Sequence, residues 1–201
     1  MSIKILGGFA RGQVLSVTKG DLVRPTTVML RRRIYDFNQS LEGVTFVDLC
    51  AGSGAMGFEA WSRGAKRVYL NEVNRHVLKS LEENRENLLV RNHHKKNGEI
   101  FCSNHPAEKW IKHFKIEYEK FSAEEKQETV IFLDPPYSEK HIYLDVVKYL
   151  LEESWYFGQL WLESDPKKGL AQSAISELGL RPVKIFEQGE SYIFVTNFPQ
   201  V

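Results

Sequence analysis

The tetrapeptide Asp134-Pro135-Pro136-Tyr137 has the residue types needed to act on the exocyclic amine of a nucleobase. The nitrogen of such an amine is a poor nucleophile, because its lone pair is delocalised into the ring. The Asp134 carboxylate and the Pro135 carbonyl can accept hydrogen bonds from the two amine protons and so direct the lone pair at a sulfonium methyl. The two prolines would hold the turn rigid, and Tyr137 could stack on a base taken out of its helix. The alternative is a simple turn that ends a strand.

A glycine-rich motif lies earlier in the chain, where the apolar run Val44–Leu49 leads into Cys50-Ala51-Gly52-Ser53-Gly54-Ala55-Met56-Gly57. A strand, a tight glycine turn and a helix start form the nucleotide-cradling element of a Rossmann-like sheet. The glycines allow a close approach of the backbone, and free N–H groups at the helix start face the ligand. NAD enzymes carry the same glycine spacing, but a dehydrogenase has no use for the tetrapeptide.

The two motifs together predict S-adenosylmethionine as the cofactor. Asp48 would meet its amino group, directly or through water, and Glu72 lies 20 residues after Gly52, where such a site places the carboxylate for the ribose hydroxyls. Asn104 would meet the adenine amine. The backbone that would face the amino-acid part of the cofactor belongs to Ala51, Gly52, Ser53, Gly54 and Gly57. For the side chains of Asp48, Glu72 and Asn104, the alternative is that each only caps a turn or a helix.

The N-terminal part of the chain is basic, although the net charge of the whole is only +1. The first 42 residues contain seven Lys or Arg and three Asp or Glu, a net charge of +4. This imbalance predicts contact with a polyanion, and the alternative is a solvated charged face. The residues expected to contact RNA are Arg11, Arg24, Thr26, Arg31, Arg32 and Arg33.

Hydrophobic periodicity predicts an α/β fold with a doubly wound, mostly parallel sheet. The expected strands are 44–49, 67–72, 99–102, 129–133 and 158–163, followed by an antiparallel hairpin of 183–186 and 192–195. Before them, 3–6 and 13–17 predict a β-hairpin, and a helix from Thr26 or Thr27 to about Leu41 should bury Leu30, Ile34, Phe37 and Leu41. We therefore expect an N-terminal extension over residues 1–42 and a catalytic domain over residues 43–201.

Composition bounds the class of protein. A chain of 201 residues with 42% hydrophobic content is long enough for one folded domain, and it has no apolar stretch of membrane-spanning length. We expect a cytoplasmic monomer with two free thiols, Cys50 and Cys102. A metal site is not expected, because the adjacent His93 and His94 cannot face one ligand together.

The chain resembles the bacterial RsmD family, the 16S rRNA (guanine-N2-)-methyltransferases that act on the guanine at position 966. The matching stretches are Ile5-Leu6-Gly7-Gly8 with Arg11-Gly12, Arg24-Pro25-Thr26-Thr27, Asp48 with Ala51–Gly57, Glu59-Ala60 with Ser62-Arg63-Gly64-Ala65, and the tetrapeptide at 134–137. The resemblance implies a class I methyltransferase that uses S-adenosylmethionine and acts on rRNA in small-subunit particles.

The sequence departs from the family pattern at Val28, Met29 and Arg32, and in the long charged stretch Glu119–Glu128. Both departures lie where they could alter RNA contacts. Three alternatives stay open: methylation of another RNA or DNA base amine such as adenine N6, a non-catalytic RNA-binding protein on the same fold, and an NAD(P) dehydrogenase.

Overall fold

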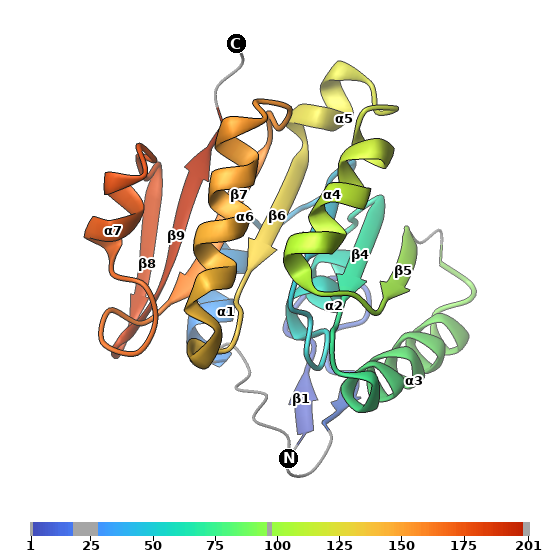
Figure 1. The fold of residues 1–201 in the computed structure, drawn as a ribbon. Coiled ribbons are helices and arrows are strands. Elements are labelled where there is room, and N and C mark those ends of the chain that lie inside the picture. Colours follow the sequence, from blue (N-terminus) through green and yellow to red (C-terminus); the bar gives the residue numbers. More distant parts are fainter. Residues whose placement is uncertain (1, 18–27, 96–97, 199–201) are drawn as a thin grey trace.

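A seven-stranded sheet forms the centre of the molecule, as seen in the computed structural model, which describes residues 2–17, 28–95 and 98–198 (Figure 1). Within these residues the strand order is β5-β4-β3-β6-β7-β9-β8. The five parallel strands are β3 (Thr45–Asp48), β4 (Arg67–Asn71), β5 (Glu99–Ser103), β6 (Thr129–Leu133) and β7 (Gln159–Ser164). The predicted α/β, Rossmann-like fold is confirmed.

The C-terminal hairpin forms as predicted, from β8 (Lys184–Gln188) and β9 (Ser191–Asn197). The antiparallel strand of this hairpin is not the edge strand of the sheet. β9 pairs antiparallel with β7 and also with β8, so the antiparallel strand lies one position inside the sheet. The outermost strand, β8, consequently runs in the same direction as the parallel strands.

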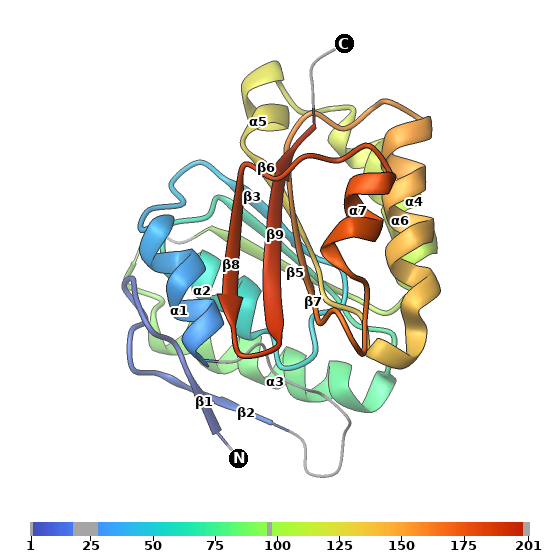
Figure 2. The same ribbon diagram turned by 90° about the vertical axis from the view of Figure 1, so that its left-hand side faces the viewer.

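Helices cover both faces of the sheet (Figure 2). On one face lie α1 (Val28–Phe37), α2 (Ala55–Ser62) and α3 (Arg75–Arg91), and on the other lie α4 (Ala107–Tyr118), α6 (Lys140–Glu152) and α7 (Gln172–Glu177). Because both faces are covered, every residue of β3 and β6 is buried. This double covering explains why the two strands are almost continuously apolar in sequence.

The N-terminal hairpin, β1 (Ser2–Lys4) and β2 (Val14–Ser16), is docked on the α2 and α3 side of the sheet. Its tip lies against the C-terminal end of α2, where Ser62 Oγ donates to the Gly7 carbonyl at 2.6 Å. Gly8 has a φ of 72°, and a Cβ there would lie 1.8 Å from the Ser62 carbonyl oxygen, so only glycine fits. The Glu59 carboxylate accepts a hydrogen bond from the Leu6 amide at 2.6 Å.

Residues 5–8 and 59–63 belong to two of the stretches that match the family pattern. These contacts give both stretches a structural role, because the two pack against each other. The hairpin and α1 also share a single hydrophobic core with the sheet, through Ile3, Leu15 and Leu30. The predicted boundary near residue 42 stays a prediction.

The predicted buried face of α1 needs a correction. Leu30 and Ile34 are buried as expected, but Phe37 is 65% exposed and Tyr35 takes its place in the core. The Tyr35 hydroxyl donates to the Met56 carbonyl at 2.6 Å, while the Phe37 ring lies on the outer side against Phe186, with ring centroids 5.6 Å apart. The helix ends at Phe37, and Leu41 is buried in the loop that follows. The expected start at Thr26 or Thr27 lies outside the described residues.

The charged stretch 119–128 contains a short helix, α5 (Ala123–Gln127). Ser122 and Glu125 form a reciprocal capping box at its start, and Glu125 also bridges Lys66 and Arg67 at 2.7 and 2.9 Å. Three carboxylate hydrogen bonds hold the pKa of Glu125 at about 2. This stretch therefore packs at the end of the sheet away from the carboxyl ends of the parallel strands.

Candidate active site

Four carboxyl groups lie near the carboxyl ends of four neighbouring strands. Phe46, Phe132 and Trp161 face the α1 and α2 layer, and Asp48, Asp134 and Glu163 each follow two positions later. Side chains alternate along a strand, so Asp48 and Glu163 face this layer, while Asp134 is the first residue after β6. The strand register pairs Leu133 with Leu162, so Asp134 and Glu163 are neighbours. The fourth carboxyl group, Glu72, follows β4.

The glycine loop turns sharply between β3 and α2. Gly52 and Gly54 have φ values of 52° and 79°, in the region that favours glycine. The Ala51 amide donates to the Asn71 carbonyl at 2.8 Å, and the Gly54 amide donates to the Ala51 carbonyl at 2.7 Å. The Ser53 carbonyl accepts from the Asn84 side chain at 3.4 Å. The loop is therefore fixed by its own backbone and by two neighbouring elements.

Gly57 has a different function from the two loop glycines. It lies inside α2, and a Cβ there would be 2.2 Å from Cδ2 of Leu70 on β4. The absence of a side chain lets the helix pack closely on the sheet. Its backbone amide hydrogen-bonds to the Asp48 carboxylate. Gly57 thus acts on the predicted cofactor site through Asp48 and through helix packing.

Asp48 is the last residue of β3, and only 1% of its surface is exposed. Backbone amides of Cys50 and Gly57 stabilise its charge, but burial together with the nearby Glu72 and Glu163 raises the pKa of Asp48 to about 8. Its Oδ1 atom is buried without a hydrogen-bond partner in the described residues. A buried acceptor without a partner is costly in isolation, so the site is prepared for a donor or a cation.

Glu72 joins the glycine loop to the start of α3. Its Oε2 accepts from the Gly52 amide at 2.9 Å, and its Oε1 accepts from the Asn74 amide at 2.8 Å. Asn74 itself caps α3 through its side chain, so Glu72 is not needed as the cap. The carboxylate of Glu72 therefore lies between the glycine loop and the first residues of α3.

Asn104 is held by its amide nitrogen, which donates to the carbonyls of Glu72 and Val73 at 2.6 and 2.8 Å. Its Oδ1 accepts from Arg75 Nε at 3.3 Å on the exposed side. These bonds join the residue after β5 to the turn after β4, whereas the alternative considered from the sequence was a cap on a turn or a helix. The predicted adenine contact stays a prediction, and Oδ1 is the atom that could accept from an amine.

The tetrapeptide begins where β6 ends, with Asp134 half-buried, Pro135 buried and Pro136 exposed. Tyr137 is half-buried at the start of a short 3₁₀ helix, Tyr137–Glu139. The Tyr143 hydroxyl, from α6, donates to the Glu163 carbonyl at 2.8 Å and approaches the Pro135 carbonyl at 3.4 Å. Burial raises the pKa of Tyr143, so its hydroxyl stays a donor. The turn is thereby fixed to β7.

Two residues of this site were not found from the sequence. Asn71 donates to the carbonyls of Leu49 and His105 at 3.1 and 2.9 Å, and so joins the ends of three strands. Tyr143 anchors the turn as described. For each of them the sequence carries only a weak signal. Asn71 is a polar residue at the end of a buried strand, and Tyr143 places a hydroxyl group on the buried face of a helix.

The predicted RNA-contacting arginines separate into two groups. Arg31 is a correction, because only 1% of it is exposed and its guanidinium donates to the Lys4 carbonyl at 2.7 Å and approaches the Ala55 carbonyl at 3.5 Å. It is a structural residue that ties β1 to the start of α2. Arg32 and Arg33 are exposed, and Arg33 donates to the Glu187 carbonyl.

Arg11 is exposed at the hairpin tip, beside the end of α2 that lies about 12 Å from the glycine loop. Arg24 and Thr26 lie outside the described residues. Within residues 2–17, 28–95 and 98–198, no cluster of three or more His, Cys, Asp or Glu is suited to a metal ion. Among these same residues no helix has the length and apolarity to cross a membrane.

Comparison with known proteins places the chain in a family. The profile described as "Conserved hypothetical protein 95" matches residues 3–173. The "Ribosomal RNA small subunit methyltransferase D" of Haemophilus influenzae is 29% identical over 156 residues, covering 76% of this chain and 72% of the relative. The Escherichia coli protein of the same name is 28% identical over 171 residues, covering 84% and 77%.

Among solved structures, the Escherichia coli protein yhhF superposes with a TM-score of 0.71 at 23% identity, with both chains covered completely. That likeness shows the fold, which is the class I methyltransferase fold. The family profile spans most of the chain and includes every strand from β3 to β7. The chain therefore belongs to the conserved hypothetical protein 95 family, which is the RsmD family.

Proposed function

We propose that this protein transfers a methyl group from S-adenosylmethionine to the exocyclic N2 amine of a guanine in small-subunit rRNA. The observation that supports this most is the position of Asp134-Pro135-Pro136-Tyr137. It follows β6, the strand adjacent to β3 and its glycine loop. The names of the related proteins support rRNA as the substrate and methyl transfer as the reaction.

The residues at the glycine loop fit the proposed cofactor. Asp48 Oδ1 is a buried acceptor without a described partner, which suits the ammonium group of S-adenosylmethionine. The Glu72 carboxylate borders the glycine loop, where the ribose hydroxyls would reach it, and Asn104 Oδ1, which accepts from Arg75, would also accept from the adenine amine. Ala51, Gly52, Ser53 and Gly54 supply the backbone that would border the amino-acid part. When bound, the cofactor supplies an electrophilic methyl group.

The turn residues would then prepare the amine. The Asp134 carboxylate and the Pro135 carbonyl would accept hydrogen bonds from the two N2 protons and direct the nitrogen lone pair. Asp134 would stabilise the positive charge that develops on the nitrogen and is placed to take up the proton that must leave. Tyr143 would keep the turn in register with β7 through its two carbonyl contacts. Tyr137 and Pro136 would border the extruded base.

RNA would approach along the exposed basic residues of the N-terminal part, which we propose to be an RNA-contacting extension over residues 1–42. Arg11, Arg32 and Arg33 have exposed side chains there, and Arg24 and Thr26 remain candidates. Arg31 is removed from this set because it is buried. The alternative of another base amine, such as adenine N6, uses the same tetrapeptide chemistry.

The test is transfer of labelled methyl groups to small-subunit particles that lack the modification, followed by digestion to nucleosides. N2-methylguanosine at a single rRNA position is the expected product. N6-methyladenosine would favour the alternative amine, and no transfer in the presence of demonstrated cofactor binding would favour a non-catalytic RNA-binding protein.

A further inference from the structure

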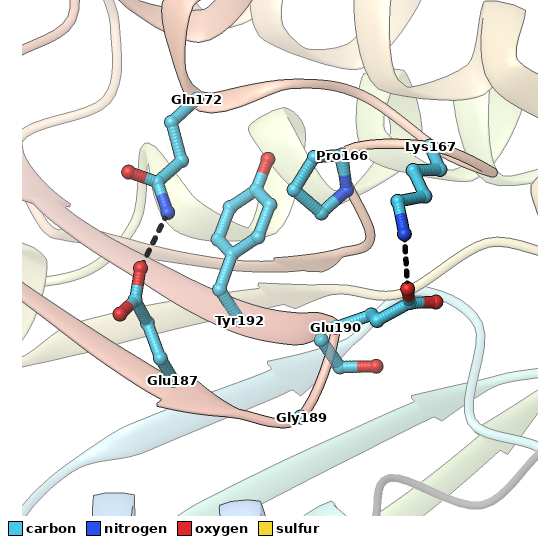
Figure 3. A pocket seen from close by; sticks show the side chains of 8 residues that line it. Pro166, Lys167, Gln172, Glu187, Gly189, Glu190 and Tyr192 are labelled. Carbon is cyan, nitrogen blue, oxygen red and sulfur yellow. Dashed lines mark hydrogen bonds and ion pairs between the residues drawn. The ribbon is translucent and has the colours of Figure 1, made fainter.

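A hollow of about 200 Å³ lies beyond the carboxyl end of β7, and no residue of the candidate cofactor site or of the tetrapeptide lines it (Figure 3). Pro166 and Lys167 line it from the loop after β7, and Gln172 lines it from the start of α7. Glu187, Glu190 and Tyr192 line it from the β8–β9 hairpin. Pockets that hold a whole drug-sized ligand measure about 300–1,000 Å³, so this hollow suits one fragment of a larger ligand.

The hollow shares a wall with the tetrapeptide. This wall is the loop 165–171, in which a Cβ on Gly169 would lie 3.0 Å from the Tyr137 ring. On its other side, the Tyr192 hydroxyl donates to the Leu170 carbonyl. Asp165 fixes the loop by accepting from the amides of Lys167 and Lys168 at 2.8 and 3.0 Å. A chain that places one base against Tyr137 can therefore place the next base beyond this wall.

The lining has the chemistry to recognise a base edge. Glu187 accepts from the Gln172 amide at 3.0 Å, and Glu190 pairs with Lys167, so two carboxylates border the hollow (Figure 3). Pro166 supplies exposed apolar surface between these pairs, beside Tyr192, which is 1% exposed. Carboxylates accept hydrogen bonds from exocyclic amines, which cytosine, adenine and guanine carry and uracil lacks.

Exposed cations lie close to the lining residues. Lys167 and Lys168 belong to the loop after β7, and Arg33 on α1 donates to the backbone carbonyl of Glu187. Such cations suit phosphates, which position a nucleic acid without reading its sequence. The arrangement of inner carboxylates and outer cations suits a nucleotide better than a free anion, which the carboxylates would repel.

We propose that this hollow receives the base of a nucleotide adjacent to the methylated guanine and favours a base with an exocyclic amine. The proposal rests on the proposed function, because it takes the target base to lie at Asp134 and Tyr137. Glu187 accepts from the amine of the neighbouring base, and Gln172 exchanges its bond to Glu187 for one to the base. Pro166 borders the ring of that base.

The experiment uses small-subunit particles reconstituted with rRNA that carries each of the four bases at each position next to the target. For the wild type, we expect kcat/KM at one of the two positions to be on the order of tenfold higher with an amine-bearing base than with uridine. In Glu187→Ala and Gln172→Ala this preference should be lost, while Glu177→Ala, an exposed change at the other end of α7, should retain it. Thermal unfolding checks that all three variants are folded.

Two results would overturn the proposal: equal rates for all four bases at both positions, or an unchanged preference in both Glu187→Ala and Gln172→Ala. Nucleoside analysis in the same assay separates this from the proposed function. A product other than N2-methylguanosine overturns the proposed function, whereas N2-methylguanosine formed without any neighbour preference overturns only the assignment of the hollow.

Discussion

The carboxylate of Glu72 accepts a hydrogen bond from the backbone amide of Gly52 at 2.9 Å. This bond joins the end of β4 to the glycine loop that follows β3, across 20 residues of sequence. The other oxygen of the same carboxylate holds Asn74 at the start of α3. Glu72 therefore shapes the loop from the side on which we propose the ribose to bind.

Glu72→Ala is expected to weaken S-adenosylmethionine binding more than tenfold, because hydrogen bonds to a charged group contribute about 1.5–3 kcal/mol. Glu72→Gln should lose less, since its amide oxygen can still accept from Gly52. Calorimetric titration measures both. A cofactor analogue without ribose hydroxyls provides the control: it should bind the wild type weakly and be almost insensitive to Glu72→Ala. Equal sensitivity for both ligands would show that Glu72 acts on the loop alone.

Cofactor affinity should depend on pH through Asp48. Its pKa of about 8 means that the carboxyl group is mostly protonated at pH 7 before binding. A bound ammonium group favours the ionised form and lowers this pKa, so binding releases a proton. Affinity should therefore rise with pH, by up to about tenfold per unit, until it levels off near pH 8.

Dissociation constants measured from pH 6 to 9 check the Asp48 prediction. Asp48→Asn cannot titrate and should bind more weakly, with only the pH dependence that the ligand itself contributes. Glu163→Gln removes a neighbouring charge that raises the pKa of Asp48. The pH at which cofactor affinity levels off should therefore be lower in this variant. A wild-type profile identical to that of Asp48→Asn would exclude the assignment.

Asp134→Ala should abolish methyl transfer without abolishing cofactor or RNA binding. The carboxylate acts most strongly in the transition state, where positive charge develops on the nitrogen. Its loss should therefore lower kcat, by a factor on the order of 10²–10³. Asp134→Asn should be less damaging, because its amide oxygen still accepts one hydrogen bond. Single-turnover rates on small-subunit particles measure the effect. Near-normal turnover by the alanine variant would refute the role of Asp134.

Arg31→Ala should destabilise the fold, while the adjacent Arg32→Ala should not. The guanidinium of Arg31 is buried against the carbonyls of Lys4 and Ala55, and its loss leaves both without this donor. A cost of about 2 kcal/mol would lower the midpoint of thermal unfolding by about 4–8 °C in a chain of this size. Matched melting curves of the two variants are the measurement, and equal midpoints would contradict the structural role.

The double variant Arg32→Ala/Arg33→Ala should weaken RNA binding and flatten its salt dependence, by about one unit of slope for each phosphate that is no longer neutralised. The matched control is Lys112→Ala/Lys148→Ala, which removes the same charge from exposed positions on the opposite layer. Cofactor affinity should stay constant in both. If the two double variants have the same salt slope, the arginines of α1 form only a solvated helix face.

The two turns of the candidate site were predictable from the sequence because each is contiguous. The glycine turn between β3 and α2 and the rigid turn after β6 each lie within one short stretch, and their residue types restrict the backbone directly. The alternation of apolar strands with helices likewise determined the doubly wound architecture. In such a sheet the carboxyl ends of the parallel strands meet at one edge, and Asp48, Glu72 and Asp134 each lie at or just after such an end.

Only the tertiary structure decided how residues far apart in sequence use their side chains. A helix period identifies positions that share a face but not which face meets the sheet, so Phe37 was expected inside and Tyr35 was overlooked. Arg31 is buried because the β1 carbonyl of Lys4 and the α2 carbonyl of Ala55 converge on it. Long-range contacts of this kind, like those of Asn71 and Tyr143 with neighbouring strand ends, have no signature in the local pattern of residues.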